Sequence, residues 1–207
     1  SNQVSGTPKA VSYEVELPTK ALLDRSKIQS FRLLEPGNVA SGYNPPFNIS
    51  YIMDDDYRTH WTASKWYGNE HVEVTFTEPV GLSAALWVPR LDGQYPNWLR
   101  CYSIRVWTDA AHGGLNGKLI VPDEDHGGRD DGATGNSSAM QTWPNVRNNP
   151  SQTHVAILPF GPLEGITKIQ VAVEQIGYNL VSLSELKFVE YDPENDIPTK
   201  IDALFAD

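Results

Sequence analysis

The feature that most constrains the fold of this sequence is a series of short segments with strand-like alternation. The run His71-Val72-Glu73-Val74-Thr75-Phe76 alternates apolar and polar residues, as expected of a strand with one buried face. Similar runs, rich in β-branched or aromatic residues and bounded by Gly, Pro, Asn or Asp, occupy residues 82–88, 101–108, 154–158, 167–173 and 183–191. Many short strands separated by polar turns predict a sandwich or a barrel.

Helical patterning is scarce. Residues 18–30 are the best helix candidate, but Leu22, Leu23 and Ile28 give too few apolar positions for an amphipathic helix. Two packed sheets would bury the inner faces of the alternating strands. We therefore predict an all-β fold, a jelly-roll-like β-sandwich.

The length of 207 residues, with 40% hydrophobic content, is enough for one main domain. We assign residues 28–191 to the sandwich, residues 1–27 to a linker or the end of a preceding domain, and residues 192–207 to a C-terminal linker. Residues 110–151 contain many Gly, Asp and Asn, which is typical of a long inserted loop. Its four Asp residues lack EF-hand spacing, so a solvated acidic loop is the favoured interpretation.

Composition narrows the possible partners. There are 16 Lys and Arg residues against 26 Asp and Glu, a formal net charge of -10. Because this charge repels other anions, we expect neither binding to nucleic acid nor insertion into a membrane. Cys101 is the only cysteine and the five His residues lack zinc-ligand spacing. Any metal should therefore be bound by oxygen. No stretch approaches the ~18 to 20 apolar residues of a membrane span, and the start at Ser1 says nothing about export.

Three separated stretches carry a resemblance to a known family. The first is Ile52-Met53-Asp54-Asp55-Asp56-Tyr57-Arg58-Thr59-His60-Trp61-Thr62-Ala63-Ser64; the second joins Leu86-Trp87-Val88-Pro89-Arg90-Leu91-Asp92-Gly93 to residues 102–107; the third is residues 181–188. Their order and spacing resemble the discoidin family, which includes coagulation factor 5/8 type C domains and galactose-type carbohydrate-binding modules of bacteria. Asp55 stands where the family usually has Gly. The 110–151 insertion and the missing end-to-end disulfide point to a bacterial-type version with the galactose-binding domain-like fold.

A structural calcium ion is the predicted cofactor. Asp54, Asp56 and Thr59 are hard oxygen donors on one tight turn, which Ca²⁺ prefers. The resemblance implies that Glu185, in the closing strand, completes the site and pins the first loop to the last strand. The alternative is that residues 54–56 only cap a turn with exposed carboxylates.

The predicted carbohydrate site lies on loops that resemble the binding rim of the galactose-type modules. Aromatic rings can stack on the apolar faces of a sugar, while Arg and Asn can hydrogen-bond its hydroxyls. The candidates are Trp66, Tyr67, Arg90, Asn97, Trp98 and Tyr178. Thr62 stands where the modules have His, and the aromatic spacing is shifted by one residue, which leaves the identity of the sugar open. Arg90 could instead only pair with Asp92, and Trp98 could pack inward.

Three further tryptophans, Trp61, Trp87 and Trp107, lie within or against strand patterns and are predicted to be core residues. No nucleophile motif, metalloprotease motif or phosphate loop is visible, so we do not expect an enzyme. The sequence favours a non-catalytic carbohydrate-binding module of an exported or cell-surface protein, located outside the cell or in the periplasm. Its expected partners are a glycan or polysaccharide and other domains of the same polypeptide. An adhesion or spacer domain of a larger surface glycoside hydrolase or peptidase remains open.

Overall fold

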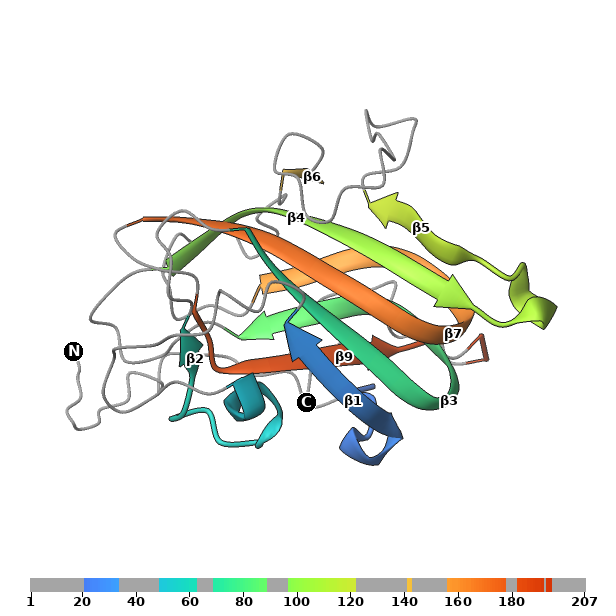
Figure 1. Cartoon of the computed structure of the whole chain (residues 1–207), viewed down its shortest axis with the longest axis horizontal. Coiled ribbons are helices and arrows are strands. Elements are labelled where there is room, and N and C mark those ends of the chain that lie inside the picture. Colours follow the sequence, from blue (N-terminus) through green and yellow to red (C-terminus); the bar gives the residue numbers. More distant parts are fainter. Residues whose placement is uncertain are drawn as a thin grey trace.

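A computed structural model describes residues 21–33, 49–62, 69–88, 97–121, 141–142, 156–177, 182–191 and 193–194. Within these residues the regular structure is almost entirely β, which confirms the predicted class (Figure 1). The strands are β1 (Ile28–Leu33), β2 (Trp61–Thr62), β3 (Asn69–Val88), β4 (Asn97–Thr108), β5 (Asn116–Val121), β6 (Gln141–Thr142), β7 (Ala156–Gly177), β8 (Ser182–Leu183) and β9 (Glu185–Glu190). The described residues also form three short 3₁₀ helices: η2 (Arg25–Lys27), η4 (Ile49–Met53) and η5 (Ala110–His112).

All described strand pairs are antiparallel. The main sheet follows the order β1-β3-β7-β4-β5, with β9 pairing β3 and β6 pairing β4, while β2 and β8 form a separate ribbon. The long strands β3 and β7 shift register between Thr75 and Ala84 of β3, and each doubles back at one end of the molecule (Figure 1). The early half of β3 therefore pairs with β1, and its late half pairs with β9. This folding-over produces the two layers of the sandwich.

The main core lies between these layers. Val72, Val74 and Phe76 of β3 are buried in it, as the alternation predicts, and Phe188 of β9 meets Phe76 edge-on with ring centroids 5.7 Å apart. Burying an aliphatic or aromatic side chain of this size stabilises the fold by roughly 1.5–3 kcal/mol. Trp61 and Trp87 are fully buried core residues, which confirms two of the three tryptophan assignments.

A second, smaller core lies on the other side of the late half of β3. Here the apolar run Ala84-Ala85-Leu86-Trp87-Val88 is buried on both faces, which explains why it does not alternate. Leu22 packs against this cluster and forms an isolated bridge with Val189. The segment from residue 21 to 27 is therefore packed on the sandwich, so a boundary at residue 27 falls within ordered structure.

Two expectations from the sequence need correction, the burial of Trp107 and the loop form of residues 110–151. Trp107 is only partly buried and lies under the Lys168 ammonium, 4.4 Å from the ring centroid, because it shares the outer face of β4 with Arg105. Residues 18–30, where the sequence has too few apolar positions for an amphipathic helix, contain η2 and the start of β1 in their described part. The 110–151 insertion carries β5 and β6 in its described parts, and both extend the sheet beside β4. Among the described residues no helix is long and apolar enough to cross a membrane.

Candidate functional site

Residues 54–59, here called the acidic turn, follow η4, and three of their oxygen atoms lie close together. Thr59 Oγ1 lies 2.5 Å from Asp54 Oδ2 and 2.9 Å from the main-chain oxygen of Asp56. Asp54 Oδ1 accepts a hydrogen bond from the Asp56 amide at 2.9 Å, which closes the turn. A hydroxyl group has one proton and can donate to only one of its two oxygen neighbours. The turn therefore presents a carboxylate, a hydroxyl and a carbonyl as neighbouring hard donors.

The side chain of Asp56 has a different role from its carbonyl. Its carboxylate accepts hydrogen bonds from Arg58 Nε at 2.9 Å, Arg58 Nη2 at 3.0 Å and the Arg58 amide at 3.0 Å. The Arg58 side-chain hydrogen bonds, followed by the main-chain one, lower the pKa of Asp56. The main-chain oxygen of Asp56 thus lies toward Thr59, while its carboxylate is engaged by Arg58.

Strand pairing brings Glu185 to this turn. Trp61 of β2 pairs antiparallel with Leu183 of β8, so the chain two residues before Trp61 approaches the chain two residues after Leu183. Those residues are Thr59 and Glu185. Glu185 also pairs with Val88 at the start of β9. Three of the predicted metal ligands, Asp54, Thr59 and Glu185, thereby come from segments that are adjacent in the fold.

Glu185 is a buried acid with an unsatisfied oxygen. Its exposed fraction is 1%, and Oε1 has no hydrogen-bond partner. Burial, together with the neighbouring Asp54 carboxylate, raises the pKa of Glu185 to about 8. Two carboxylates can hydrogen-bond only through a shared proton, so without a proton or cation the pair is unfavourable. Within the described residues, no three His, Cys, Asp or Glu side chains form a metal-binding group by themselves. A cation here would need Thr59 and main-chain oxygens as well.

Two residues that sequence reasoning missed hold the turn from outside. Asp55 has a φ of 58°, in the left-handed region where its family counterpart is Gly, and its Oδ1 accepts from Lys187 Nζ at 2.6 Å. Lys187 Nζ also lies 3.8 Å from Glu185 Oε2. The sequence signal that could have identified Lys187 is its spacing from Glu185, because residues two apart in a strand share a face.

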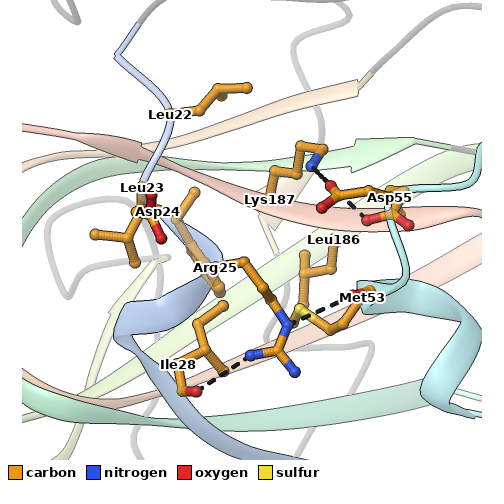
Figure 2. A pocket seen from close by; sticks show the side chains of 11 residues that line it. Leu22, Leu23, Asp24, Arg25, Ile28, Met53, Asp55, Leu186 and Lys187 are labelled. Carbon is orange, nitrogen blue, oxygen red and sulfur yellow. Dashed lines mark hydrogen bonds and ion pairs between the residues drawn. The ribbon is translucent and has the colours of Figure 1, made fainter.

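A cavity adjoins the turn. It has a volume of about 230 Å³ and lies between the segment before β1, the end of η4 and β9 (Figure 2). Arg25 enters it from η2 and donates to the carbonyls of Met53 at 3.4 Å and Ile28 at 3.2 Å. The guanidinium also lies over the Phe31 ring, 5.5 Å from its centroid. Arg25 therefore holds Met53, just before the acidic turn, and Lys187 holds Asp55 within it; both link the turn to the sandwich.

The predicted carbohydrate residues fall largely outside the described part of the chain. This applies to Trp66, Tyr67, Arg90 and Tyr178, whereas Asn97 and Trp98 are described in their main chain only, as the first residues of β4. Their pairing partners are Gly177 and Ile176 of β7. The sugar site therefore stays a prediction at the level of side chains.

The described strand ends that adjoin these segments do have a defined arrangement. Asn69 at the start of β3 pairs with Glu174, and Asn97 at the start of β4 pairs with Gly177 at the end of β7. Because β3 doubles back, its other end, Val88, returns to the same end of the sandwich (left in Figure 1). The described strand ends next to residues 66–67, 90 and 178 in the sequence therefore lie at this one end.

Comparison with known proteins gives matches by structure alone. No family model matches the sequence, and no curated protein sequence matches it. Solved structures do match. The paired CBM32-1 and CBM32-2 domains of Clostridium perfringens ZmpB, in complex with GalNAc, align with a TM-score of 0.58 and 18% identity over 91% of this chain and 40% of that one.

Two single-domain structures match over nearly their whole length. The family 32 carbohydrate-binding module of C. perfringens NanJ, in complex with galactose, aligns with a TM-score of 0.52 and 16% identity over 81% of this chain and 97% of that one. An F5/8 type C domain from Bacteroides fragilis aligns with a TM-score of 0.56 and 16% identity over 82% and 95%.

These likenesses confirm the predicted discoidin-type sandwich as a fold. Identities of this size do not carry function, because one fold hosts many functions. The chain spans only 16% of a longer ZmpB structure that also contains an M60 catalytic domain. It therefore has the fold of modules that occur within larger proteins.

Proposed function

We propose that this chain is a non-catalytic carbohydrate-binding module of an exported or cell-surface protein. The observation that carries the proposal is the shared fold: the chain matches the NanJ module, solved with galactose, over 97% of that module. The described strand ends add support, because those next to the predicted sugar-binding residues in the sequence lie at one end of the sandwich. Sites built from several loops at one end of a rigid sandwich are a common way to bind ligands.

The residue types in these segments suit a sugar. Trp66, Tyr67 and Tyr178 supply rings that can stack on the apolar face of a pyranose. Arg90 offers several N–H donors in a fixed plane, and Asn97 offers both a donor and an acceptor. Together they could recognise two neighbouring hydroxyls and so select the stereochemistry of the ligand. We propose galactose-type sugars, including N-acetylhexosamines, as the first class to test.

We also propose that a calcium ion stabilises the end of the sandwich. The ligand groups would be the carboxylates of Asp54 and Glu185, the Thr59 hydroxyl and the main-chain oxygen of Asp56. These are hard oxygen donors, and the buried Glu185 Oε1, which has no hydrogen-bond partner, could coordinate a cation in place of the proton. Bound there, calcium would supply a positive charge that links the first loop to the last strand. The residues themselves already set the turn through the Asp54 and Thr59 hydrogen bonds.

Isothermal titration tests the sugar-binding proposal. The parent chain, Trp66→Ala and Arg90→Ala are titrated with galactose and N-acetylgalactosamine, with Arg32→Ala as the matched control. Arg32 is an exposed arginine that forms an ion pair with Glu73 on the neighbouring strand. We expect binding by the parent and the control, and at least a tenfold loss in the other two variants at unchanged melting temperature. A folded parent that binds no sugar would favour the spacer or adhesion role instead.

A melting experiment tests the calcium proposal. A ligand that binds only the folded state, at 100 times its dissociation constant, stabilises it by about 2.7 kcal/mol, which for a domain of this size is roughly 5–10 °C. We expect chelation to lower the melting temperature reversibly and Glu185→Ala to remove the effect. Identical melting curves with and without calcium would overturn the metal site without touching the sugar site.

A further inference from the structure

We propose that Lys187 is a tethered cation that competes with calcium for the acidic turn, so that it stabilises the metal-free domain and weakens calcium binding. This inference rests on the calcium site proposed above. It concerns a residue of this chain that lies beside the predicted ligands and is not one of them.

The first step is the position of the ammonium group. Lys187 Nζ lies 2.6 Å from Asp55 Oδ1 and 3.8 Å from Glu185 Oε2. Its side chain is 18% exposed, and the ammonium lies 5.8 Å from the centroid of the Tyr57 ring. Figure 2 shows Lys187 reaching from β9 toward Asp55 on the acidic turn. The positive charge is therefore held between the turn and the buried carboxylate.

The second step is what this charge does without a metal. Asp54, Asp55 and Asp56 are consecutive acids, and Glu185 is buried close to them. Arg58 pairs with Asp56, while Lys187 pairs with Asp55 and faces Glu185. Like charges at this spacing repel one another unless cations lie among them. Among the described residues, Lys187 thus supplies a positive charge on the Glu185 side of the cluster.

The third step is what the charge does to an arriving ion. Calcium lies about 2.3–2.6 Å from its oxygen ligands, so an ion bound to Glu185 would be within several Å of the Lys187 ammonium. Repulsion between a single and a double positive charge about 6 Å apart, even in a water-like medium, corresponds to about a tenfold change in the dissociation constant. Lys187 therefore stabilises the acidic turn without a metal and weakens the binding of calcium to it.

Charge competition has to be separated from simple tethering of the turn. If Lys187 acts only by holding Asp55 in place, then Lys187→Met and Asp55→Asn both break the tether and shift calcium affinity in the same direction. If it acts by its charge, the two variants shift affinity in opposite directions. Lys187→Met removes a positive charge, whereas Asp55→Asn removes a negative one and leaves the ammonium in place. Asn tolerates the left-handed conformation of residue 55, so this variant keeps the backbone.

The experiment measures calcium affinity by titration calorimetry, and the melting temperature in chelator, for the parent and four variants. Lys187→Met should bind calcium about tenfold more tightly and melt at a lower temperature without it. Asp55→Asn should bind calcium more weakly, and Lys187→Arg should behave like the parent. The matched control is Lys168→Met, since Lys168 also has an acidic partner, Glu73 at 3.9 Å, and an aromatic ring, Trp107; its calcium affinity should not change.

The outcomes are distinct. Unchanged or weaker calcium binding by Lys187→Met, with a binding parent, would overturn the inference and leave the calcium site standing. Binding by Lys187→Met alone would support strong competition. No binding by either protein would overturn the calcium site and this inference together. If Lys187→Met is unfolded in chelator, folding on addition of calcium is the expected result, and failure to fold at any calcium concentration counts against it.

Discussion

Trp61 pairs with Leu183 in the short β2–β8 ribbon, and this pairing is what joins the acidic turn to the last strand. Ser184, next in the chain, donates from its amide to the Val88 carbonyl at 2.8 Å. Glu185 then pairs with Val88 as β9 begins. A ribbon with two residues in each strand is therefore the link between two segments that are more than a hundred residues apart in the sequence.

The two acids that flank Asp55 should respond differently to the same substitution. We expect Asp54→Asn to weaken calcium binding at least tenfold, because its carboxylate lies at the Thr59 hydroxyl. Asp56→Asn should retain most of the binding, because its carboxylate is engaged by Arg58 and only its carbonyl faces Thr59. Calcium titration of both variants checks this. Equal losses would mean that the Asp56 carboxylate turns inward when the ion binds.

The stability of the metal-free protein should depend on pH through Glu185. Its pKa is raised to about 8 from 4.5, so the folded state holds a proton that the unfolded state releases. The sign follows from proton linkage: this contribution is present below pH 4.5 and is lost as the pH rises to about 8. Calcium affinity should rise over the same window because the ion replaces the proton.

Denaturant unfolding in chelator at several pH values between 5 and 8.5 measures this dependence. The control is Glu185→Gln, which cannot ionise and should show a flatter profile. A parent and a control with superimposable pH profiles would show that Glu185 does not titrate in this range.

Two glycines in β7 allow a test of packing beside η5. Gly161 and Gly165 both have positive φ, 80° and 73°, so alanine at either should cost about 1 kcal/mol in backbone strain. At Gly165 a Cβ would lie 2.4 Å from Nδ1 of His112, whereas at Gly161 nothing lies within 4 Å. We expect Gly165→Ala to cost at least about 2 kcal/mol more than Gly161→Ala. Equal free energies of unfolding would show that His112 moves aside freely.

Much of the fold was predictable because it depends on local alternation. Val72, Val74 and Phe76 show their buried face in the sequence itself, and their burial is confirmed. Trp107 was misassigned because alternation along β4 puts it on the outer face, whereas its place within a strand pattern had suggested the core. β5 was missed because it lies within a segment that is rich in turn residues, and its strand form depends on pairing with β4.

The site could be predicted only where one short stretch carried it. Asp54, Asp56 and Thr59 lie within six residues, so their shared turn is visible in the sequence. Glu185 was reached through family resemblance, and the β2–β8 pairing gives the physical reason for its position. The ion pair between Asp55 and Lys187 joins residues 132 positions apart. No local pattern could indicate that contact, because it depends on the packing of the turn against β9.

The central claim is that this sandwich binds glycans, and a glycan array with the folded, calcium-treated chain tests it most directly. We expect retention on a defined class of glycans ending in galactose or N-acetylgalactosamine, and loss of that signal in Arg90→Ala with an unchanged melting temperature. A folded chain that is retained on no glycan, or an Arg90→Ala variant with the same pattern as the parent, would contradict the account.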